Sequence, residues 1–354
     1  MEALPWSDSA ARIMQQEASP KITDLSAVPE LPKLDARIPK WDTQTLRARP
    51  CPICRRADPP VLKRPDGLPV SYCPDCALWY VCGIPPDAEI YAIYQGYWFD
   101  CRPKQLNEKG ARAIRKAAKS AVNVDLRVQR LMALLGTLKG KLILEVGAGT
   151  GEFLSAVRYA GADVIANEIS SEACDFLERA LQIPVVRGEL ADAPWDFDLP
   201  VVVVMSDLVE HPIEPCRLLS RAVSLLKHGG RLVIWTPNGG GAGREATTAK
   251  GWVGFRVDLE HLQYFSTRTI QVLADTWGLH IDHLETTGYP GLSGIDKLPV
   301  KNKDTFASSL VTAAKRLIER LAPRIPKIRQ IARELRQQPR VRGSYHLFAI
   351  LTKP

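Results

Sequence analysis

From Lys141 onward the chain alternates short apolar runs with longer amphipathic stretches. Short apolar runs favour strands, and apolar positions repeated every three or four residues favour helices. The predicted strands cover residues 142–146, 164–166, 184–186, 201–204, 231–235, 280–284 and 346–351. The predicted helices cover residues 107–138, 152–160, 171–181, 215–227 and 266–277. Strands that alternate with helices predict an α/β fold, with a largely parallel sheet covered on both faces.

The remaining segments lack this rhythm. Residues 1–46 are rich in proline and polar residues, and we interpret them as a flexible leader. Residues 47–104 hold a cluster of cysteines followed by an aromatic segment. The α/β domain is expected to span residues 105–354, with a basic helical insertion at residues 297–342.

The net charge of +8 resides in that insertion. Residues 297–342 contain 13 lysines and arginines against three acidic residues, a net charge of +10, so the rest of the chain carries −2. Within residues 306–335, apolar positions recur at helical spacing, and Pro323 and Pro326 divide the stretch into two pieces. A basic amphipathic helix can pack on its own domain, make peripheral contact with an anionic membrane, or bind RNA. The sequence leaves these alternatives open.

The chain has no run of about 18 apolar residues, so no transmembrane helix is predicted. Its first 25 residues are polar and lack an apolar stretch of the length of a signal peptide. We therefore expect a cytoplasmic protein, whose cysteines stay reduced unless they bind a metal.

The most informative motif reads Glu-Val-Gly-Ala-Gly-Thr-Gly over residues 145–151, between the first predicted strand and a predicted helix. Glycines there let the backbone approach a ligand closely. A dinucleotide-binding loop would need a third glycine at the position that Glu152 occupies. A carboxylate at Glu145 suits a cationic ligand, and Glu168, at the end of the second strand, suits ribose hydroxyls. The alternative is that Glu168 only caps the following helix.

Residues 142–238 resemble the class I S-adenosylmethionine-dependent methyltransferases. The resemblance rests on the glycine motif, on Ser-Asp-Leu-Val-Glu-His after the fourth strand and on Thr-Pro-Asn after the fifth, and it points to the ubiquinone-methyltransferase-like branch. It implies a Rossmann-like, seven-stranded methyltransferase sheet and S-adenosyl-L-methionine as the cofactor. It further implies a cofactor-binding set in which Glu189 is the weakest match, namely Glu145, Gly147, Gly149, Gly151, Glu168, Glu189 and Asp207.

Methyl transfer is an in-line displacement at a sulfonium, so the protein mainly orients the reactants. A general base helps when the acceptor is a hydroxyl or an activated C–H, and imidazole is the natural candidate. His211 is the first candidate, and its alternative is a structural histidine that bonds a backbone carbonyl. His261 and Tyr264 are further candidates, beneath a mobile lid hinged at the glycine-rich residues 239–243. In the alternative, Ser266 caps the following helix and the aromatic residues belong to the core, so His261 has no catalytic role.

The cysteine cluster consists of two Cys-x-x-Cys turns, Cys51 with Cys54 and Cys73 with Cys76, separated by 18 residues. This is the spacing of a two-knuckle zinc site, in which four thiolates close a tetrahedral, structural Zn²⁺ site. Disulfides are the alternative. The arrangement resembles methyltransferases that carry an N-terminal zinc ribbon followed by a tyrosine-rich segment, here residues 91–99.

Together these features predict a methyltransferase with a small-molecule acceptor, such as a sugar, a lipid-linked compound or another metabolite. The alternative is an RNA methyltransferase that holds nucleic acid with its ribbon and basic helices. An Asn/Asp-Pro-Pro-aromatic motif after the fourth strand is absent, which argues against nucleic acid as the partner. A third interpretation is a noncatalytic, cofactor-binding scaffold, and the intact glycine loop argues against it. The oligomeric state is not predicted.

Overall fold

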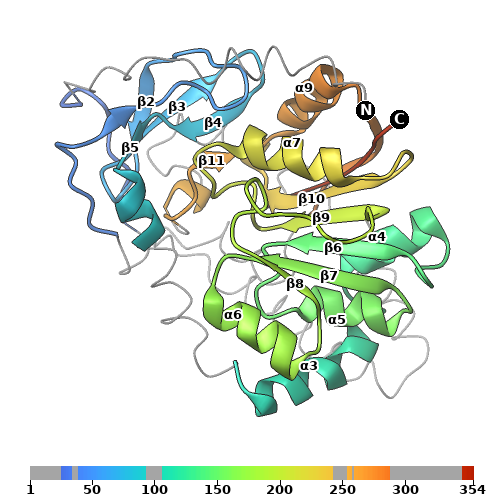
Figure 1. The fold of residues 1–354 in the computed structure, drawn as a ribbon. Coiled ribbons are helices and arrows are strands. Elements are labelled where there is room, and N and C mark those ends of the chain that lie inside the picture. The colour runs from blue at the N-terminus through green and yellow to red at the C-terminus, as the bar shows by residue number, and fades with distance from the viewer. Residues whose placement is uncertain (1–24, 34–38, 93–105, 242–252, 257–258, 288–344) are drawn as a thin grey trace, which may run out of the picture.

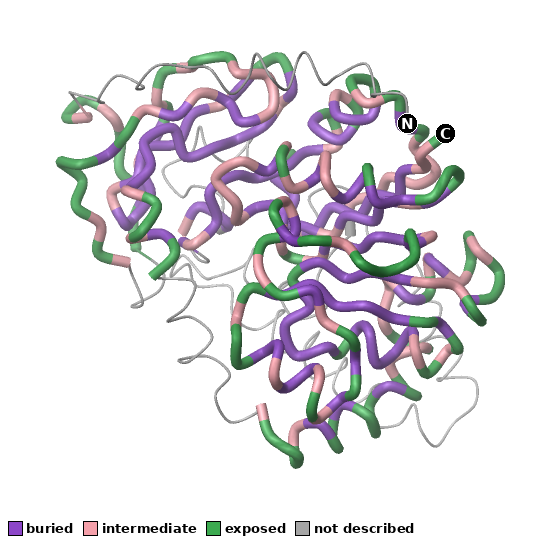
Figure 2. Tube along the Cα trace, in the orientation of Figure 1, coloured by how far each residue is buried: buried purple, intermediate pink, exposed green. Residues whose placement is uncertain are grey.

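The structure is a computed structural model that describes residues 25–33, 39–92, 106–241, 253–256, 259–287 and 345–354. Figure 1 shows a large sheet with helices on its faces and a smaller sheet packed beside it. The buried residues run along the strands of both sheets and along the inner sides of the helices (Figure 2).

The large sheet contains seven of the described strands, and each predicted strand is present. They are β6 (Leu142–Val146), β7 (Asp163–Glu168), β8 (Val185–Arg187), β9 (Val202–Ser206), β10 (Arg231–Pro237), β12 (His280–Thr287) and β13 (His346–Thr352). The order across the sheet is β12-β13-β10-β9-β6-β7-β8. Strands β6 to β10 are parallel, while β13 is antiparallel to both β10 and β12. The strand order reverses between β6 and β9, where α/β sheets of this kind bind ligands.

The helices follow the prediction except in the first segment. They are α3 (Glu108–Ala121), α4 (Leu126–Leu135), α5 (Glu152–Tyr159), α6 (Ser171–Asp175) with the π-helical turn η1 (Phe176–Ala180), α7 (Pro215–Leu225) and α9 (Thr267–Trp277). The single helix predicted over residues 107–138 is wrong, because the chain turns after Ala121 and begins a second helix. Asp125 starts that helix, since its carboxylate accepts a hydrogen bond from the backbone N–H of Arg127 at 2.9 Å.

The two faces of the large sheet bury different cores, because successive side chains of a strand point to opposite sides. Ile143 and Val204 belong to the core formed with α3, α4 and α5. Leu144 and Val203 belong to the core formed with α7 and α9. This second core also contains Cys51 and other buried residues of the smaller sheet, so both sheets pack around a shared interior.

The smaller sheet has the order β11-β4-β3-β2, and its cysteine-bearing part, residues 47–84, is called the ribbon below. Its strands are β2 (Pro60–Lys63), β3 (Pro69–Cys73) and β4 (Leu78–Val81), and β1 (Arg47–Ala48) pairs separately with β5 (Gly83–Ile84). The edge strand β11 (Gln263–Tyr264) comes from the other end of the chain, between β10 and α9. The division at residues 104 and 105 stays a prediction, and β11 joins the two sides of it.

The predicted mobile lid stays a prediction, because most of the segment after its hinge lies outside the described residues. The described residues just before α9 belong to the smaller sheet. Gln263 and Tyr264 are buried and pair with Tyr80 and Trp79, so this part of the segment is a strand fixed on the ribbon. Ser266 does cap α9, as the alternative interpretation has it, because its hydroxyl accepts from the N–H of Thr269 at 3.1 Å.

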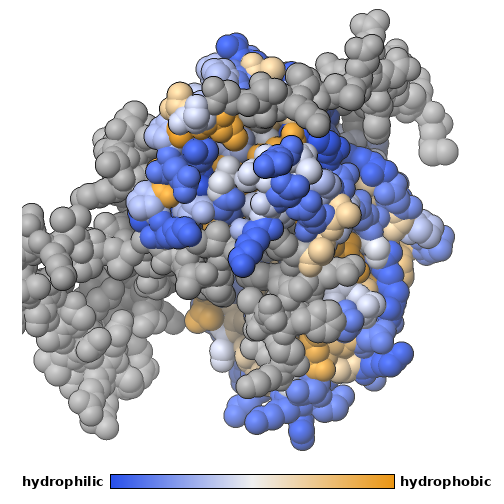
Figure 3. Space-filling model, turned by 90° about the vertical axis from the view of Figure 1, so that its left-hand side faces the viewer, coloured by the Kyte–Doolittle hydropathy of each residue, from blue (hydrophilic) through white to orange (hydrophobic). Residues whose placement is uncertain are grey.

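Several predicted features lie outside the described residues. They are the basic insertion at residues 297–342, the aromatic segment beyond residue 92, most of the leader at residues 1–46, and the part of the hinge after residue 241. Within the described part of the chain, no helix is long and apolar enough to cross a bilayer. The face shown in Figure 3 is mainly hydrophilic where residues are described, with apolar residues in small groups. Such small groups are ordinary on a water-exposed surface.

Candidate active site and metal centre

The glycine loop connects β6 to α5 in a conformation that explains its sequence. Gly147, Gly149 and Gly151 have φ angles of 69°, 54° and 71°, in the left-handed region that disfavours a side chain. At Gly151 a Cβ atom would also lie 2.6 Å from the Cδ2 atom of Leu177. The loop therefore needs glycine for its backbone shape and for its packing.

Glu145 lies on β6 just before this loop and is buried. Burial raises the pKa of its carboxyl to about 8, against the opposing effect of the Arg127 guanidinium. Its Oε2 atom has no hydrogen-bond partner among the described residues. Because a buried carboxylate oxygen without a partner is costly, this atom fits a cationic ligand group such as the amino end of S-adenosylmethionine.

Glu168, at the end of β7, ties the glycine loop to the next helix. Its Oε2 atom accepts from the N–H of Gly149 at 2.8 Å, and its Oε1 atom accepts from Ile169 and Ser170 at 2.8 and 3.0 Å. The carboxylate thus bonds the backbone just before α6, whose N-cap is Ser170. Ribose binding stays a prediction, since a carboxylate has about four acceptor positions.

Glu189 lies just after β8 and contacts the segment that leads away from the ribbon. The hydroxyl of Tyr91 donates a hydrogen bond to its carboxylate, which raises the pKa of Tyr91 to about 12. The adenine-side role expected for Glu189 stays a prediction. Tyr91 is thus the described residue that contacts Glu189 from the ribbon side.

Arg127 is a charged residue of this region that the sequence analysis missed. It lies at the start of α4, pairs with Asp125 at 2.6 Å, and places its guanidinium carbon 4.9 Å from the ring centroid of Phe153. The carboxyls of Asp125, Glu145 and Asp207 outweigh its burial and raise its pKa. Nothing in the sequence distinguishes it from the other basic residues of its helix, because its position depends on how α4 packs.

Asp207 and His346 meet at the edge of the sheet where β9 ends. Asp207 follows β9 with a φ angle of 48°, which is unusual for a residue with a side chain. Its half-exposed carboxylate lies 4.0 Å from Nε2 of His346, whose ring stacks on Trp235 at 4.8 Å. The sequence analysis missed His346 because only the antiparallel pairing of β13 with β10 brings the start of β13 to this edge.

His211 and His261 lie together at the same edge, with ring centroids 4.7 Å apart in an edge-to-face arrangement. The ring of His211 lies beside the backbone carbonyls of Glu260 and Asp207, and burial lowers its pKa to about 4. Those carbonyl contacts support the structural alternative for His211. At neutral pH its imidazole is uncharged.

The structure surrounds His261 with the groups of a candidate base. Its Nε2 atom lies 4.0 Å from Oε1 of the buried Glu210, and Oε2 of Glu210 accepts from the hydroxyl of Thr236 at 2.9 Å. Burial first, and then the charge of Arg64 and the charges that His211 and His346 carry when protonated, lower the pKa of His261 well below its usual value. Its Nδ1 atom is buried without a hydrogen-bond partner among the described residues. His261 is therefore a neutral imidazole able to take a proton.

Tyr264 lies in the interior of the smaller sheet, and its catalytic role stays a prediction. Its side chain is fully buried, with its ring 4.9 Å from that of Phe255. Its hydroxyl accepts a hydrogen bond from the Arg64 guanidinium at 3.2 Å. The reason is β11, which turns this residue into the interior of the ribbon sheet.

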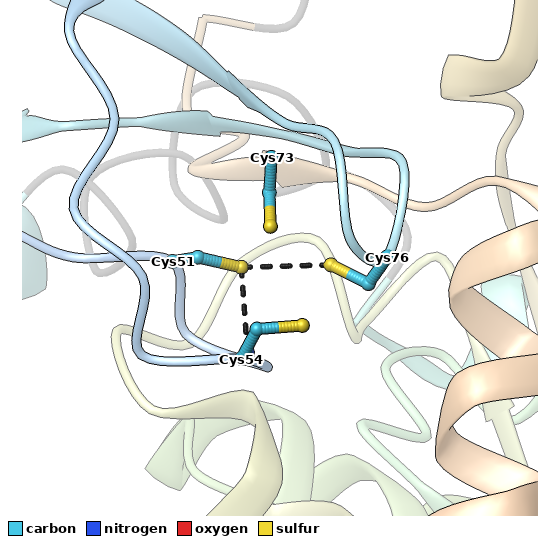
Figure 4. Close-up of side chains that lie close together, drawn as sticks. All are labelled: Cys51, Cys54, Cys73 and Cys76. Atoms are coloured by element: carbon cyan, nitrogen blue, oxygen red, sulfur yellow. Dashed lines mark hydrogen bonds between the residues drawn. The ribbon is translucent and has the colours of Figure 1, made fainter.

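The four predicted metal ligands come together at one end of the ribbon. Figure 4 shows the side chains of Cys51, Cys54, Cys73 and Cys76 pointing toward one centre, and their sulfur atoms all lie within 4.8 Å of one another. The sulfurs of Cys51 and Cys76 are 3.6 Å apart, too far for a disulfide. A tetrahedral site with Zn–S bonds of about 2.3 Å needs sulfurs roughly 3.8 Å apart. The donor set and its spacing therefore fit a closed, structural Zn²⁺ site.

The same knuckles contact the α/β domain directly. The Cys216 thiol, in α7, donates to the carbonyl of Pro52, and the hydroxyl of Thr269, in α9, donates to the carbonyl of Cys76 at 2.9 Å. Arg55, in the first knuckle, forms an ion pair with Glu214 at 2.5 Å. The candidate metal centre is therefore part of the interface between the two sheets.

Comparison with known proteins assigns the α/β domain. Residues 117–284 match the sequence model of a family described as a methyltransferase domain. The glycine loop and the strand order agree with this match, so the domain is similar to the class I S-adenosylmethionine-dependent methyltransferases.

Three relatives illustrate where the similarity lies. A demethylmenaquinone methyltransferase of Clavibacter sepedonicus is 32% identical over 99 residues, 27% of this chain and 40% of the relative. A ubiquinone biosynthesis O-methyltransferase of Xylella fastidiosa is 31% identical over 110 residues, 28% of this chain and 44% of the relative. The S-adenosylmethionine sensor upstream of mTORC1 of Danio rerio is 27% identical over 194 residues, 49% of each. The chain thus spans less than half the length of these relatives.

Among solved structures, magnesium protoporphyrin IX methyltransferase from Synechocystis PCC 6803 with bound SAH aligns with a TM-score of 0.42 and 16% identity. The alignment covers 75% of this chain and all of that one.

Proposed function

We propose that the protein is an S-adenosylmethionine-dependent methyltransferase that acts on a small-molecule acceptor, with His261 as the general base. The observation that carries the proposal is the placement of two different groups at one sheet edge. The carboxyl of Glu145 lies just before the glycine loop, and the neutral imidazole of His261 lies beyond the end of β9. Electrophile and base thus have separate places at one edge.

The cofactor side uses charges that the structure already holds in position. The unpartnered oxygen of Glu145 would hold the cofactor's ammonium, and the Arg127 guanidinium would hold its carboxylate. Glu168 keeps the glycine loop in shape and retains acceptor positions for ribose hydroxyls. S-Adenosylmethionine, when bound, supplies the electrophilic methyl group on its sulfonium.

On the acceptor side, His261 would take the proton and Glu210 would stabilise the resulting charge. Glu210 faces Nε2 of His261, so the other ring nitrogen, Nδ1, is the one left to accept a proton. A carboxylate beside an imidazole favours its charged form, which offsets the burial that lowers its pKa. His211 remains the second candidate, and its carbonyl contacts favour a role in orienting the loop after β9.

Two observations favour a small acceptor over RNA. Two relatives are a ubiquinone biosynthesis O-methyltransferase and a demethylmenaquinone methyltransferase, so an aromatic hydroxyl or an activated ring carbon is a suitable acceptor. The ribbon, which the RNA alternative needs as a binding surface, has one edge paired with β11 and its cysteines buried against the α/β domain. That edge and those cysteines are therefore not available to nucleic acid.

The proposal is tested by incubating the zinc-loaded chain with S-adenosylmethionine carrying a tritiated methyl group. The acceptors are cell-extract fractions of RNA, lipids and small molecules, and Glu145→Gln is the control. We expect label in the small-molecule or lipid fraction, and none with the variant. Label in RNA alone would overturn the small-molecule acceptor. Tight cofactor binding without transfer to any fraction would contradict an enzyme and favour the sensor-like role named for the Danio rerio relative.

A further inference from the structure

The segment that carries His261 is held by the ribbon. Its residues 263–264 form β11, which pairs with β4, and the N–H of Val81 donates to the carbonyl of Leu262 at 2.8 Å. On its other side, the N–H of Leu262 donates to the carbonyl of Glu210 at 2.8 Å. The backbone next to His261 is therefore bonded to the ribbon and to the loop after β9 at once.

Arg64 is a fully buried arginine of the ribbon whose side chain ends at this segment. Its guanidinium donates to the backbone carbonyls of His261 and Leu259 and pairs with Asp66, which also accepts from the Trp41 indole N–H at 2.8 Å. A buried charge is tolerated only when it is paired and hydrogen-bonded. The Arg64 guanidinium thus donates a hydrogen bond to the backbone of His261, the residue proposed as the base.

Arg49 makes a second set of bonds between the ribbon and the same region. Its guanidinium donates to the carbonyl of Ile213 at 2.5 Å, to Oε1 of Gln263 at 2.7 Å and to the carbonyl of Leu262 at 3.3 Å. The side-chain amide of Gln263 donates in turn to the carbonyls of Val209 and Pro212 at 2.7 and 2.9 Å. Arg49 and Gln263 therefore join the loop that carries Glu210 and His211 to the strand that follows His261.

We propose that Arg64 and Arg49 are positioning residues for His261, and that the metal-loaded ribbon forms part of the acceptor side of the site. The inference rests on the proposed role of His261. None of the hydrogen bonds that the described residues show for these two arginines reaches Glu145, Glu168 or the glycine loop. Loss of either arginine should therefore disturb the base and spare the cofactor side.

The test follows the titration of His261 by NMR of the imidazole C–H groups, in the zinc-loaded full chain. The six histidines are assigned with His261→Gln and His211→Gln, and binding of S-adenosylhomocysteine is measured by calorimetry. The titratable or charged side chains around His261 are those of Glu210, His211, His346, Arg64 and Tyr264. In the wild type, burial should keep the pKa of His261 well below its usual value.

In Arg64→Gln we expect His261 to become solvated and to titrate closer to the ordinary pH of about 6.5, while the Kd of S-adenosylhomocysteine changes less than about twofold. Arg64→Lys keeps a positive charge beside Asp66, but an ammonium lacks the planar set of donors that bonds two carbonyls at once. This variant should therefore give an intermediate shift of the His261 titration. The matched control is Arg56→Gln, an exposed ribbon arginine that pairs with Asp58. An unchanged His261 titration in both Arg64 variants, with S-adenosylhomocysteine still bound, would overturn the proposal.

The metal is tested with the same readout. Removing zinc with a chelator should give the His261 shift of Arg64→Gln, while S-adenosylhomocysteine binding persists. If His261 titrates as before in the zinc-free chain, the ribbon metal has no part in positioning it. Once an acceptor is known, kcat in Arg64→Gln should fall about 100-fold with an unchanged KM for the cofactor, because small misplacements of a catalytic group are costly. If no fraction accepts methyl from the wild type, the proposed function fails, and the NMR result still reports on the positioning.

Discussion

The cofactor side and the acceptor side of the candidate site are built in different ways. The cofactor side comes from one continuous stretch, residues 142–170, in which a strand, the glycine loop, a helix and the next strand follow each other. The acceptor side joins stretches that are far apart in the chain, namely residues 49–66, 207–214 and 259–264 together with His346. The cofactor side is thus a local sequence motif, whereas the acceptor side is assembled from distant segments of the chain.

The difference lies also in what holds each side in place. The cofactor side depends on backbone geometry and on one carboxylate that bonds backbone N–H groups. The proposed acceptor side is held by the buried guanidinium groups of Arg49 and Arg64. Buried charges are sensitive to the loss of a partner, so damage to the ribbon should affect the acceptor side first.

The largest effect is expected from breaking the metal centre. Cys51→Ser should lose the bound zinc and lower the stability of the whole chain, because the cysteines belong to the core shared with α7 and α9. Structural zinc contributes on the order of 10 kcal/mol of apparent binding free energy in small zinc domains. Metal analysis and thermal unfolding measure the effect. Cys82→Ser, a buried thiol outside the cluster, is the control that should keep its zinc.

The next effect should come from the base. His261→Asn is expected to lower turnover by about 10²–10⁴-fold while cofactor affinity is unchanged, because general-base catalysis contributes a factor of this size. The pKa of His261 lies well below its usual value, so the neutral form persists as the pH falls below 6.5. The wild-type rate should then stay flat from pH 8 to below pH 6 if proton abstraction limits it. A loss of activity centred near pH 6.5 would contradict this assignment.

A smaller effect is expected on the cofactor side. Glu145→Gln removes the charge with little change of shape and should weaken binding of S-adenosylhomocysteine about 30-fold, since a hydrogen bond to a charged group contributes ~2 kcal/mol. Glu152→Gln, an exposed residue on the neighbouring helix, should bind normally. The free carboxyl of Glu145 has a pKa of about 8, so binding an ammonium near neutral pH should release a proton. Wild-type affinity should therefore rise with pH up to about 8, and in Glu145→Gln this dependence should be lost.

The smallest effect concerns the border between the two sides. Tyr91→Phe removes the hydrogen bond to Glu189 and should weaken cofactor binding only a few-fold, because a single exposed hydrogen bond contributes ~1 kcal/mol or less. Calorimetry of the full chain measures it. If Glu189→Gln and Tyr91→Phe both bind the cofactor as the wild type does, Glu189 has no part in holding the adenine side.

The sequence predicted most of the fold because its signals are local. All seven strands of the large sheet follow from short apolar runs, and the glycine loop follows from residues within one turn of the chain. The prediction of a single helix over residues 107–138 was also wrong for a local reason. Asp125 caps a second helix within a stretch whose apolar periodicity is unbroken. The four cysteines were recognisable because the two turns of a metal site have a fixed internal spacing.

The amino-acid sequence by itself determined the α/β domain, the cofactor loop and the metal ligands, because each depends on residues close together in the chain. Only the tertiary structure decided that Tyr264 is buried in the ribbon, that His346 and Arg127 border the site, and that Arg64 bonds the carbonyl of His261. These facts depend on which distant strands pair and which buried charges find partners. Hydrophobic periodicity predicts the type of each element but not which elements lie next to it. The acceptor side therefore could not be predicted without the pairing of β11 with β4.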